Sequence, residues 1–233
     1  MIPIISVINL AIGAGSIYVA TDIYLHIYKH TKNLEYFYFS LMFLSAGMFF
    51  IIFGLPGLLV TDLSIIQYDY TFSILFVFLG LASFLSTIEL AHTKKSISYV
   101  FWILAFLGIL DVYLSLPYAL PVKVEVWRQF IFYLPQGEKA LIYLDGFSAV
   151  AMVIIGTLVF LNSYINLGKI GSSRSARNRS LLFVFGGVSL MISGIFLYGW
   201  YDHMALWNIW GEALFAAFWL YCFGSAVLKE SAA

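Results

Sequence analysis

Charge is the scarcest property of this sequence. Asp, Glu, Lys and Arg make up 10% of its 233 residues, whereas hydrophobic residues make up 62%. A water-soluble protein of this length cannot remove that much apolar surface from water, so the composition excludes a soluble protein and indicates a lipid bilayer. The formal net charge is zero, and nothing in the composition points to a nucleic-acid partner.

Cysteine is almost absent, with Cys222 as the single example. One cysteine excludes an internal disulfide and any cysteine-rich metal site. The N-terminus also lacks a basic segment and a small-residue cleavage site. We therefore interpret the first apolar run as a retained membrane span rather than a signal peptide.

Long apolar runs fill the chain instead. A membrane-spanning helix needs roughly 20 mostly apolar residues, and seven such runs follow one another. We expect one all-α domain over residues 1–233, a polytopic integral membrane protein that folds as a seven-transmembrane-helix bundle. The predicted spans are 3–28, 36–60, 70–92, 97–118, 141–167, 180–201 and 205–227.

Lysine and arginine are distributed unequally between the connections. Nine of the twelve follow the first, third and fifth spans or lie in the C-terminal tail, and three lie on the other side, namely Lys123, Arg128 and Lys139. Because Lys and Arg gather in cytoplasmic loops, the pattern predicts an N-terminus outside and a C-terminus in the cytoplasm. The expected location is a prokaryotic cytoplasmic membrane.

Two connections stand out. The most polar, 168–180, reads GKIGSSRSARNRS. We expect a flexible cytoplasmic loop near anionic lipid, with a docking site for a cytoplasmic partner as the alternative. In the longest, 119–140, three valines alternate with charged residues between 122 and 126, a period typical of a strand. A simple connector, a short strand and an interfacial lid all fit that segment.

The apolar runs contain acids but no Lys or Arg. A buried acid without a basic partner must be protonated, hydrogen-bonded, hydrated or paired with a bound cation. We therefore look for the functional site among the five acids of these runs, which are Asp22, Glu89, Asp111, Asp145 and Glu212.

One group of candidates lies toward the cytoplasmic side. Asp22, His26 and His30 recur at every fourth residue and so share a helix face, and Glu89 and His92 end the third span. Carboxylate and imidazole are ligands for zinc or iron, and His26 with His92 could hold one haem b. The simplest interpretation is that these side chains are hydrated at the interface, with a metal or haem site as the alternative.

The spacing Asp-x3-His-x3-His from Asp22 to His30 is similar to that of intramembrane metal hydrolases of the alkaline ceramidase type, which also have seven spans. That resemblance implies a metal-dependent membrane enzyme. Those proteins also draw histidines from a late helix, and the predicted seventh span here has none.

A second group of candidates lies toward the outer side. Asp111, Asp145 and Glu212 are at comparable depths in their spans, and Asn208 precedes Glu212 by one turn on the same face. A cavity that combines acids with aromatic rings suits an organic cation or a proton relay. The alternative is that each acid is protonated and hydrogen-bonded to a neighbour or, for Asp145, paired with a nearby base.

Small residues predict where helices approach closely. The candidates are Ala11 with Gly15, Ala213 with Ala217, and the group Gly186, Gly187, Ser193 and Gly194. Pro56 lacks a backbone N–H, so it predicts a kink or a helix end near the outer end of the second span.

In its layout the chain resembles the seven-helix membrane sensor regions at the N-terminus of prokaryotic histidine kinases. The resemblance lies in short basic cytoplasmic turns and in the glycine-dotted, aromatic-rich segments 41–54 and 181–194. It implies a sensor that binds a ligand and signals to the cytoplasm. Because the chain ends five residues after Leu228, signalling would use a separate cytoplasmic partner.

A second resemblance is to sugar transporters of the SWEET type, which are built as three plus one plus three helices. The first and fifth spans share an orientation, as parallel repeats require. The residues Tyr198, Gly199, Asp202, Asn208 and Gly211 look like the end of the second repeat of that family. This resemblance implies transport of a small solute.

The leading hypothesis is a non-enzymatic sensor that binds a ligand or proton at Asp111, Glu212, Asp145 and Asn208. A small-solute or proton-coupled transporter, a metal-dependent intramembrane enzyme, and a structural or redox subunit of a membrane complex are the alternatives. Retinal is not expected as a cofactor, because the last span has a lysine, Lys229, only at its cytoplasmic end.

Overall fold

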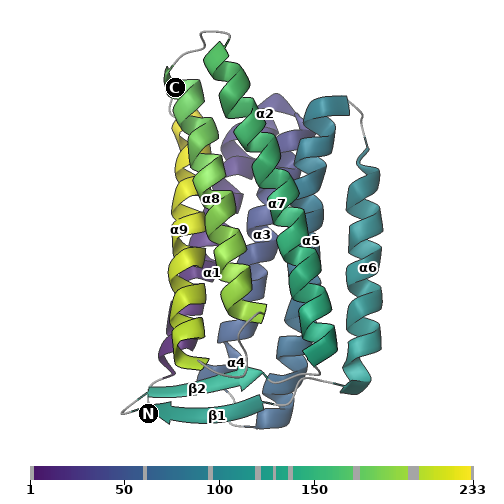
Figure 1. Ribbon diagram of the computed structural model, residues 1–233, viewed down its shortest axis with the longest axis vertical. Helices are drawn as coiled ribbons and strands as arrows, with labels where there is room; N and C mark the ends of the chain where they lie inside the picture. The colour runs from purple at the N-terminus through teal and green to yellow at the C-terminus, as the bar shows by residue number, and fades with distance from the viewer. Residues whose placement is uncertain are drawn as a thin grey trace.

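The computed structural model describes the backbone of residues 3–59, 62–93, 97–118, 122–127, 130–135, 139–169, 174–198 and 205–231. These residues are almost entirely helical and form seven long helical rods, joined in one place by a β-hairpin (Figure 1). The prediction of an all-α architecture is confirmed at that level. Five of the rods are long and apolar enough to cross a membrane, and α6 and the described part of α7 are shorter apolar helices.

The first two rods each consist of more than one helix. The first rod contains α1 (Ile4–Asp22), a π-helical turn η1 (Ile23–Tyr28) and α2 (Lys29–Thr31). The second contains α3 (Leu34–Gly54) and α4 (Pro56–Leu59), separated at Leu55. The interruption before Pro56 is the one that the sequence predicts, because proline supplies no donor to the preceding turn.

The remaining rods are single helices. They are α5 (Leu63–Thr93), α6 (Tyr99–Ser115) with a 3-10 turn η2 (Leu116–Tyr118), α7 (Lys139–Lys169), α8 (Arg174–Tyr198) and α9 (Ala205–Ser231). α5 starts earlier than its predicted bound of 70, because Asp62 accepts hydrogen bonds from the Ser64 backbone N–H and hydroxyl at 2.9 and 2.7 Å. α8 starts at Arg174, so the predicted loop 168–180 is mostly helix.

Six rods form a closed ring. In the order α1, α3, α5, α7, α8 and α9, each rod contacts the next, and α9 packs back against α1. α6 lies outside this ring against α5, and no other described helix contacts it to a comparable extent (Figure 1). The contacts between α5 and α7 and between α9 and α1 are less extensive than the others. The ring therefore divides at these two places into a first unit of α1, α3 and α5 and a second unit of α7, α8 and α9.

The hairpin marks one end of the ring. β1 (Val122–Trp127) pairs antiparallel with β2 (Phe130–Pro135), with Val122 opposite Pro135. The alternation of valines therefore predicts a strand correctly. The hairpin lies across the end of the bundle that also holds the N-terminus, and it contacts α1 and α5 (Figure 1). We call this the hairpin end, and the opposite end, with α2 and the C-terminus, the basic end.

Glycine brings α1 and α3 together. A methyl group added at Gly47 would lie 3.0 Å from the Gly13 carbonyl oxygen and 3.2 Å from the Ile17 backbone nitrogen. The reciprocal contact is as close, because a methyl at Gly13 would lie 3.0 Å from the Gly47 carbonyl oxygen. Two backbones that touch in this way leave no space for a side chain at the crossing.

The predicted small-residue contacts are correct in part. Gly186 packs on Phe223 of α9 and Gly187 on Thr157 of α7, so the small face of α8 is confirmed. Ala11 and Ala217 are exposed, however, and the pairs Ala11–Gly15 and Ala213–Ala217 do not form packing faces. Gly15 instead packs against Leu220, and the buried alanines of α9 include Ala213 and Ala216.

Gly47→Ala should destabilise the protein, because its new methyl group meets backbone atoms that cannot rotate away. Overpacking of this kind costs about 1–3 kcal/mol, which exceeds the gain in helix propensity from Gly to Ala. Gly80→Ala is the matched control, since its methyl group would meet nothing closer than 3.7 Å. Thermal unfolding in detergent measures both, and equal shifts for the two variants would contradict the close crossing.

Candidate functional site

A cavity of about 120 Å³ lies in the centre of the ring. Its walls come from α3, α5, α7, α8 and α9, so it lies between the two three-helix units. The lining is almost wholly apolar and includes the aromatic side chains Phe49, Phe50, Phe76, Phe84 and Trp219. The polar members of the lining are Glu212 and Ser193.

Glu212 is the charged residue of this cavity. Its side chain is 4% exposed, and its Oε1 atom has no hydrogen-bond partner among the described residues. From α8, the hydroxyl of Ser193 donates to the Glu212 carbonyl oxygen at 3.2 Å. A carboxyl group buried in this way is costly unless something neutralises or binds it.

The sequence of α9 turns Glu212 inward. Residues 212, 216, 219 and 223 follow helical spacing and share one face. All four are buried, namely Glu212, Ala216, Trp219 and Phe223. The opposite face carries the exposed Leu214 and Tyr221. Glu212 thus occupies a position where the helix pattern calls for an apolar residue.

Trp219 adds a second unpaired polar atom. It is 2% exposed, lies two turns from Glu212 on the same helix face, and lines the cavity. Its indole Nε1 has no hydrogen-bond partner within the described part of the chain. Buried indole N–H groups usually have a partner, so the cavity offers one free donor besides the carboxyl group.

An aromatic cluster closes the cavity toward the basic end. It consists of Phe39, Phe43, Phe84, Phe160, Phe183 and Phe223. Phe160 and Phe183 stack at 4.7 Å between ring centroids, and Phe183 meets Phe223 at 5.2 Å. Both three-helix units contribute rings to this cluster, and Phe84 belongs to it and to the cavity wall. Any relative motion of the units would rearrange it.

Asn9 is a buried polar residue that sequence reasoning missed. It is 1% exposed, and neither of its amide atoms has a partner in the described structure. The contacts of Gly15 with Leu220 and of Gly224 with Val19 set the parallel register of α1 and α9. By that register Asn9 lies within about one helical turn of Glu212 along the bundle axis. A single amide inside an apolar run is the signal that could have revealed it.

The structure separates Asp111 from Glu212. Asp111 lies on α6, outside the ring, and does not line the cavity. Its side chain is half-buried, and Oδ2 has no partner among the described residues. The expected outer cluster is therefore not brought together by these two acids. The side chains of Asp145 and Asn208 lie outside the described residues, although their backbones belong to α7 and α9.

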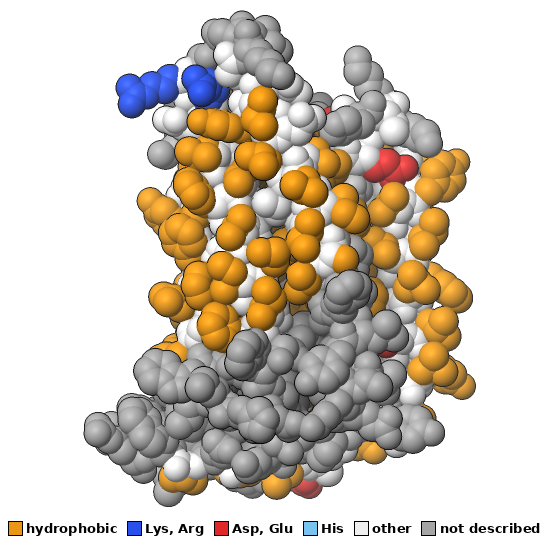
Figure 2. Space-filling view, viewed as in Figure 1, with side chains coloured by type: hydrophobic (Ala, Val, Ile, Leu, Met, Phe, Trp, Pro, Cys, Tyr) orange, Lys and Arg blue, Asp and Glu red, His pale blue; other side chains and the backbone are white. Residues whose placement is uncertain are grey.

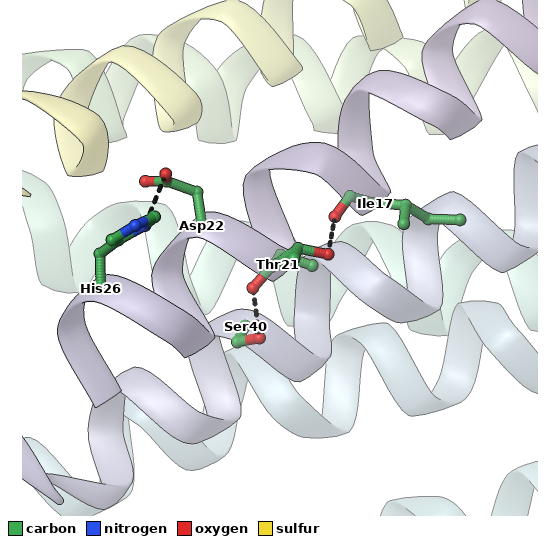
Figure 3. A network of polar contacts seen from close by, with 6 residues as sticks. Ile17, Thr21, Asp22, His26 and Ser40 are labelled. Atoms are coloured by element: carbon green, nitrogen blue, oxygen red, sulfur yellow. Dashed lines mark hydrogen bonds and ion pairs between the residues drawn. The ribbon is translucent and has the colours of Figure 1, made fainter. Parts of the chain in front are cut away.

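At the basic end the structure joins Asp22 to His26. The His26 Nδ1 lies 2.9 Å from Asp22 Oδ1, across the start of the π-helical turn (Figure 3). The second carboxylate oxygen of Asp22 is buried without a described partner, while His26 and His30 are exposed. Asp22 and His26 thus share a helix face, as the sequence predicts.

Glu89 forms hydrogen bonds with the start of α6. Its Oε2 lies 2.6 Å from the Ser98 hydroxyl and accepts from the Val100 backbone N–H at 3.3 Å. The Ser98 hydroxyl also accepts from the Phe101 N–H at 3.1 Å, so it caps α6. Glu89 thereby ties the start of α6 to the end of α5 and is not joined to Asp22 or His26 by any contact in the described structure.

The described residues contain no group of three His, Cys, Asp or Glu side chains close enough to hold a metal ion. The haem hypothesis requires the side chain of His92, which lies outside the described residues, so the distance between His26 and His92 does not test it.

No protein-family model and no curated protein matches the sequence of this chain. The site is therefore interpreted from its own geometry.

Ser98→Ala should loosen α6, because it removes the cap and the hydroxyl that Glu89 and Ser86 contact. Loss of a cap costs about 1 kcal/mol. Hydrogen exchange measured by mass spectrometry should speed up at the start of α6 and stay unchanged in α9. Ser163→Ala is the matched control, since that hydroxyl bonds to the Val159 carbonyl of its own helix.

Unchanged exchange in Ser98→Ala would contradict this assignment of the network.

Proposed function

We propose that this chain is an integral membrane protein that binds a small ligand or a proton at Glu212 and passes the event to its cytoplasmic end by a shift of its helices. The observation that carries the proposal is a carboxyl group, 4% exposed, with an unpaired oxygen in an apolar cavity between two three-helix units.

Membrane insertion with seven spans is supported by the surface of the bundle. Hydrophobic side chains cover its middle, and Lys and Arg lie at the end that holds the C-terminus (Figure 2). Exposed residues on this surface include Trp102, Phe106 and Leu214, each more than half exposed. Large apolar surfaces of this kind mark contact with lipid or another protein. The basic end is then cytoplasmic and the hairpin end external.

The aromatic cluster supplies a route for transmission. It lies directly between the cavity and the basic end, and it contains rings from α3, α5, α7, α8 and α9. A change of charge or volume at Glu212 alters the packing of Trp219, which stacks on Phe43 at 5.4 Å. Packed rings move in steps rather than continuously, so such a change is passed on to both units. A cytoplasmic partner would read it at the segment 168–180.

Trp219 should report the state of Glu212, because both line the same cavity. We expect the emission of Trp219 to change between mildly acidic and alkaline pH in the wild-type protein and in Asp111→Asn, and to stay constant in Glu212→Gln. The contribution of Trp219 is isolated by subtracting the spectrum of a Trp219→Phe version of each protein, measured in lipid nanodiscs.

Asp111→Asn is the matched control, since it also removes one acid from an apolar helix but lies outside the ring. An unchanged response in Glu212→Gln, or a response lost in Asp111→Asn, would show that Glu212 is not the binding group.

Transport through the same cavity is a second candidate, and the layout of the helices favours it. The first helix of each unit contacts the last helix of the other, α1 with α9 and α7 with α5, and α6 connects the units from outside the ring. Transporters built from parallel repeats have this arrangement and place the substrate site between the repeats, where this cavity lies.

Proteoliposomes with an internal pH dye separate the two candidates. A transporter that uses Glu212 should dissipate an imposed pH gradient, with the rate reduced at least tenfold in Glu212→Gln and unchanged in Asp111→Asn. A sensor should leave the gradient intact in all three proteins, and that result would remove proton-coupled transport while leaving the binding site in place.

A further inference from the structure

The size, walls and single acid of the central cavity together define the ligand. We propose that the cavity binds a small organic cation, and that the cation takes the place of a proton on Glu212. This inference rests on the proposed binding site at Glu212 and names the chemical class that fits it.

The volume limits the size of the ligand. The cavity measures about 120 Å³. An engineered protein cavity of about 150 Å³ holds one benzene molecule, so the ligand has about six non-hydrogen atoms or fewer. Short alkylammonium ions fit.

The charge balance selects a cation. No Lys or Arg side chain lines the cavity, and none belongs to the buried core of the described residues. An unpaired carboxylate in such surroundings is costly, and we take Glu212 to carry a proton when no cation is bound. A ligand that brings its own positive charge removes the need for that proton, whereas an anion would place two negative groups in an apolar space.

The walls of the cavity also favour an organic cation. Aromatic rings line the space beside Glu212, namely those of Phe49, Phe50, Phe76, Phe84 and Trp219. The faces of aromatic rings attract ammonium groups, and the attraction grows when water is excluded. A neutral ligand of equal size would gain only contact with the walls and would leave Glu212 unpaired.

Binding is then an exchange. The protonated carboxyl group of Glu212 gives up its proton to water, the alkylammonium ion enters intact, and the carboxylate oxygen accepts a hydrogen bond from the N–H group of the cation. No covalent bond to carbon changes. One proton leaves for each cation that binds, and the net charge of the occupied cavity stays at zero.

Butylammonium and 1-butanol form a matched pair of probes, since they share shape and size but differ in charge. We expect wild-type protein in nanodiscs to bind radiolabelled butylammonium in equilibrium dialysis. A pH indicator in weakly buffered solution should show about one proton released per cation bound. 1-Butanol should release none. Asp111→Asn should behave as wild type, and Glu212→Gln should neither retain the cation nor release protons.

A second variant leaves Glu212 in place. Ala46→Phe puts a ring into the cavity wall, so it should lose butylammonium binding and proton release although the acid is intact. If Glu212→Gln does not fold, the comparison of the two probes on wild-type protein and on Ala46→Phe decides the question. Proton release that persists in Ala46→Phe would overturn the proposal.

The failure of this inference is distinguishable from the failure of the proposed function. If Trp219 emission responds to pH through Glu212 but butylammonium is not bound or releases no proton, the cation is the wrong ligand and the site stands. If Trp219 emission does not respond and butylammonium is not bound, both proposals are wrong.

Discussion

The fold depends on close approach between helices at glycine. In a bilayer the lipid solvates apolar side chains as well as another helix does, so helices associate where small residues let backbones and rings come close. Gly13 and Gly47 join α1 to α3 backbone to backbone, Gly156 receives the ring of Phe84 from α5, and Gly186 receives Phe223 from α9. These three contacts lie in different parts of one ring, and together they hold its two units around a common centre.

A ring of helices has a centre that its own side chains must fill. Large rings occupy its basic half, where Phe39, Phe183 and Phe223 meet. The other half also has aromatic rings, but it includes the small or flexible Ala46, Met191 and Gly194, and the cavity remains there. The position of the cavity thus follows from the distribution of side-chain volume along the five helices that line it.

Composition alone predicts the helices well and their neighbours poorly. Runs of about 20 apolar residues define the spans, and glycines on α8 correctly indicate its packing face. Depth along a span can be read from residue number, and it places Asp111 and Glu212 at similar heights. Residue number contains no information about the angle around the bundle axis. Apart from Asp111, α6 is almost uniformly apolar, so its sequence does not show that it lies outside the ring. Long-range register brings Asn9 and Trp219 to the level of the cavity, so the lone amide of Asn9 in an apolar run marks an unusual residue but does not show where it lies.

The buried acids differ in how their charge is balanced, and that difference is the reason for proposing Glu212. Asp22 has a histidine at 2.9 Å, and Glu89 has a hydroxyl and a backbone N–H. Asp111 is half-buried on the outermost helix, so part of its surface reaches the surroundings of the bundle. Glu212 has the least exposure and an oxygen without a described partner, yet it lies where the bundle leaves open space. A structural acid would be expected to have a fixed partner, because an unmet carboxyl group lowers stability. A binding group must instead leave its partner's place open, and Glu212 is the described acid that does so at the wall of a cavity.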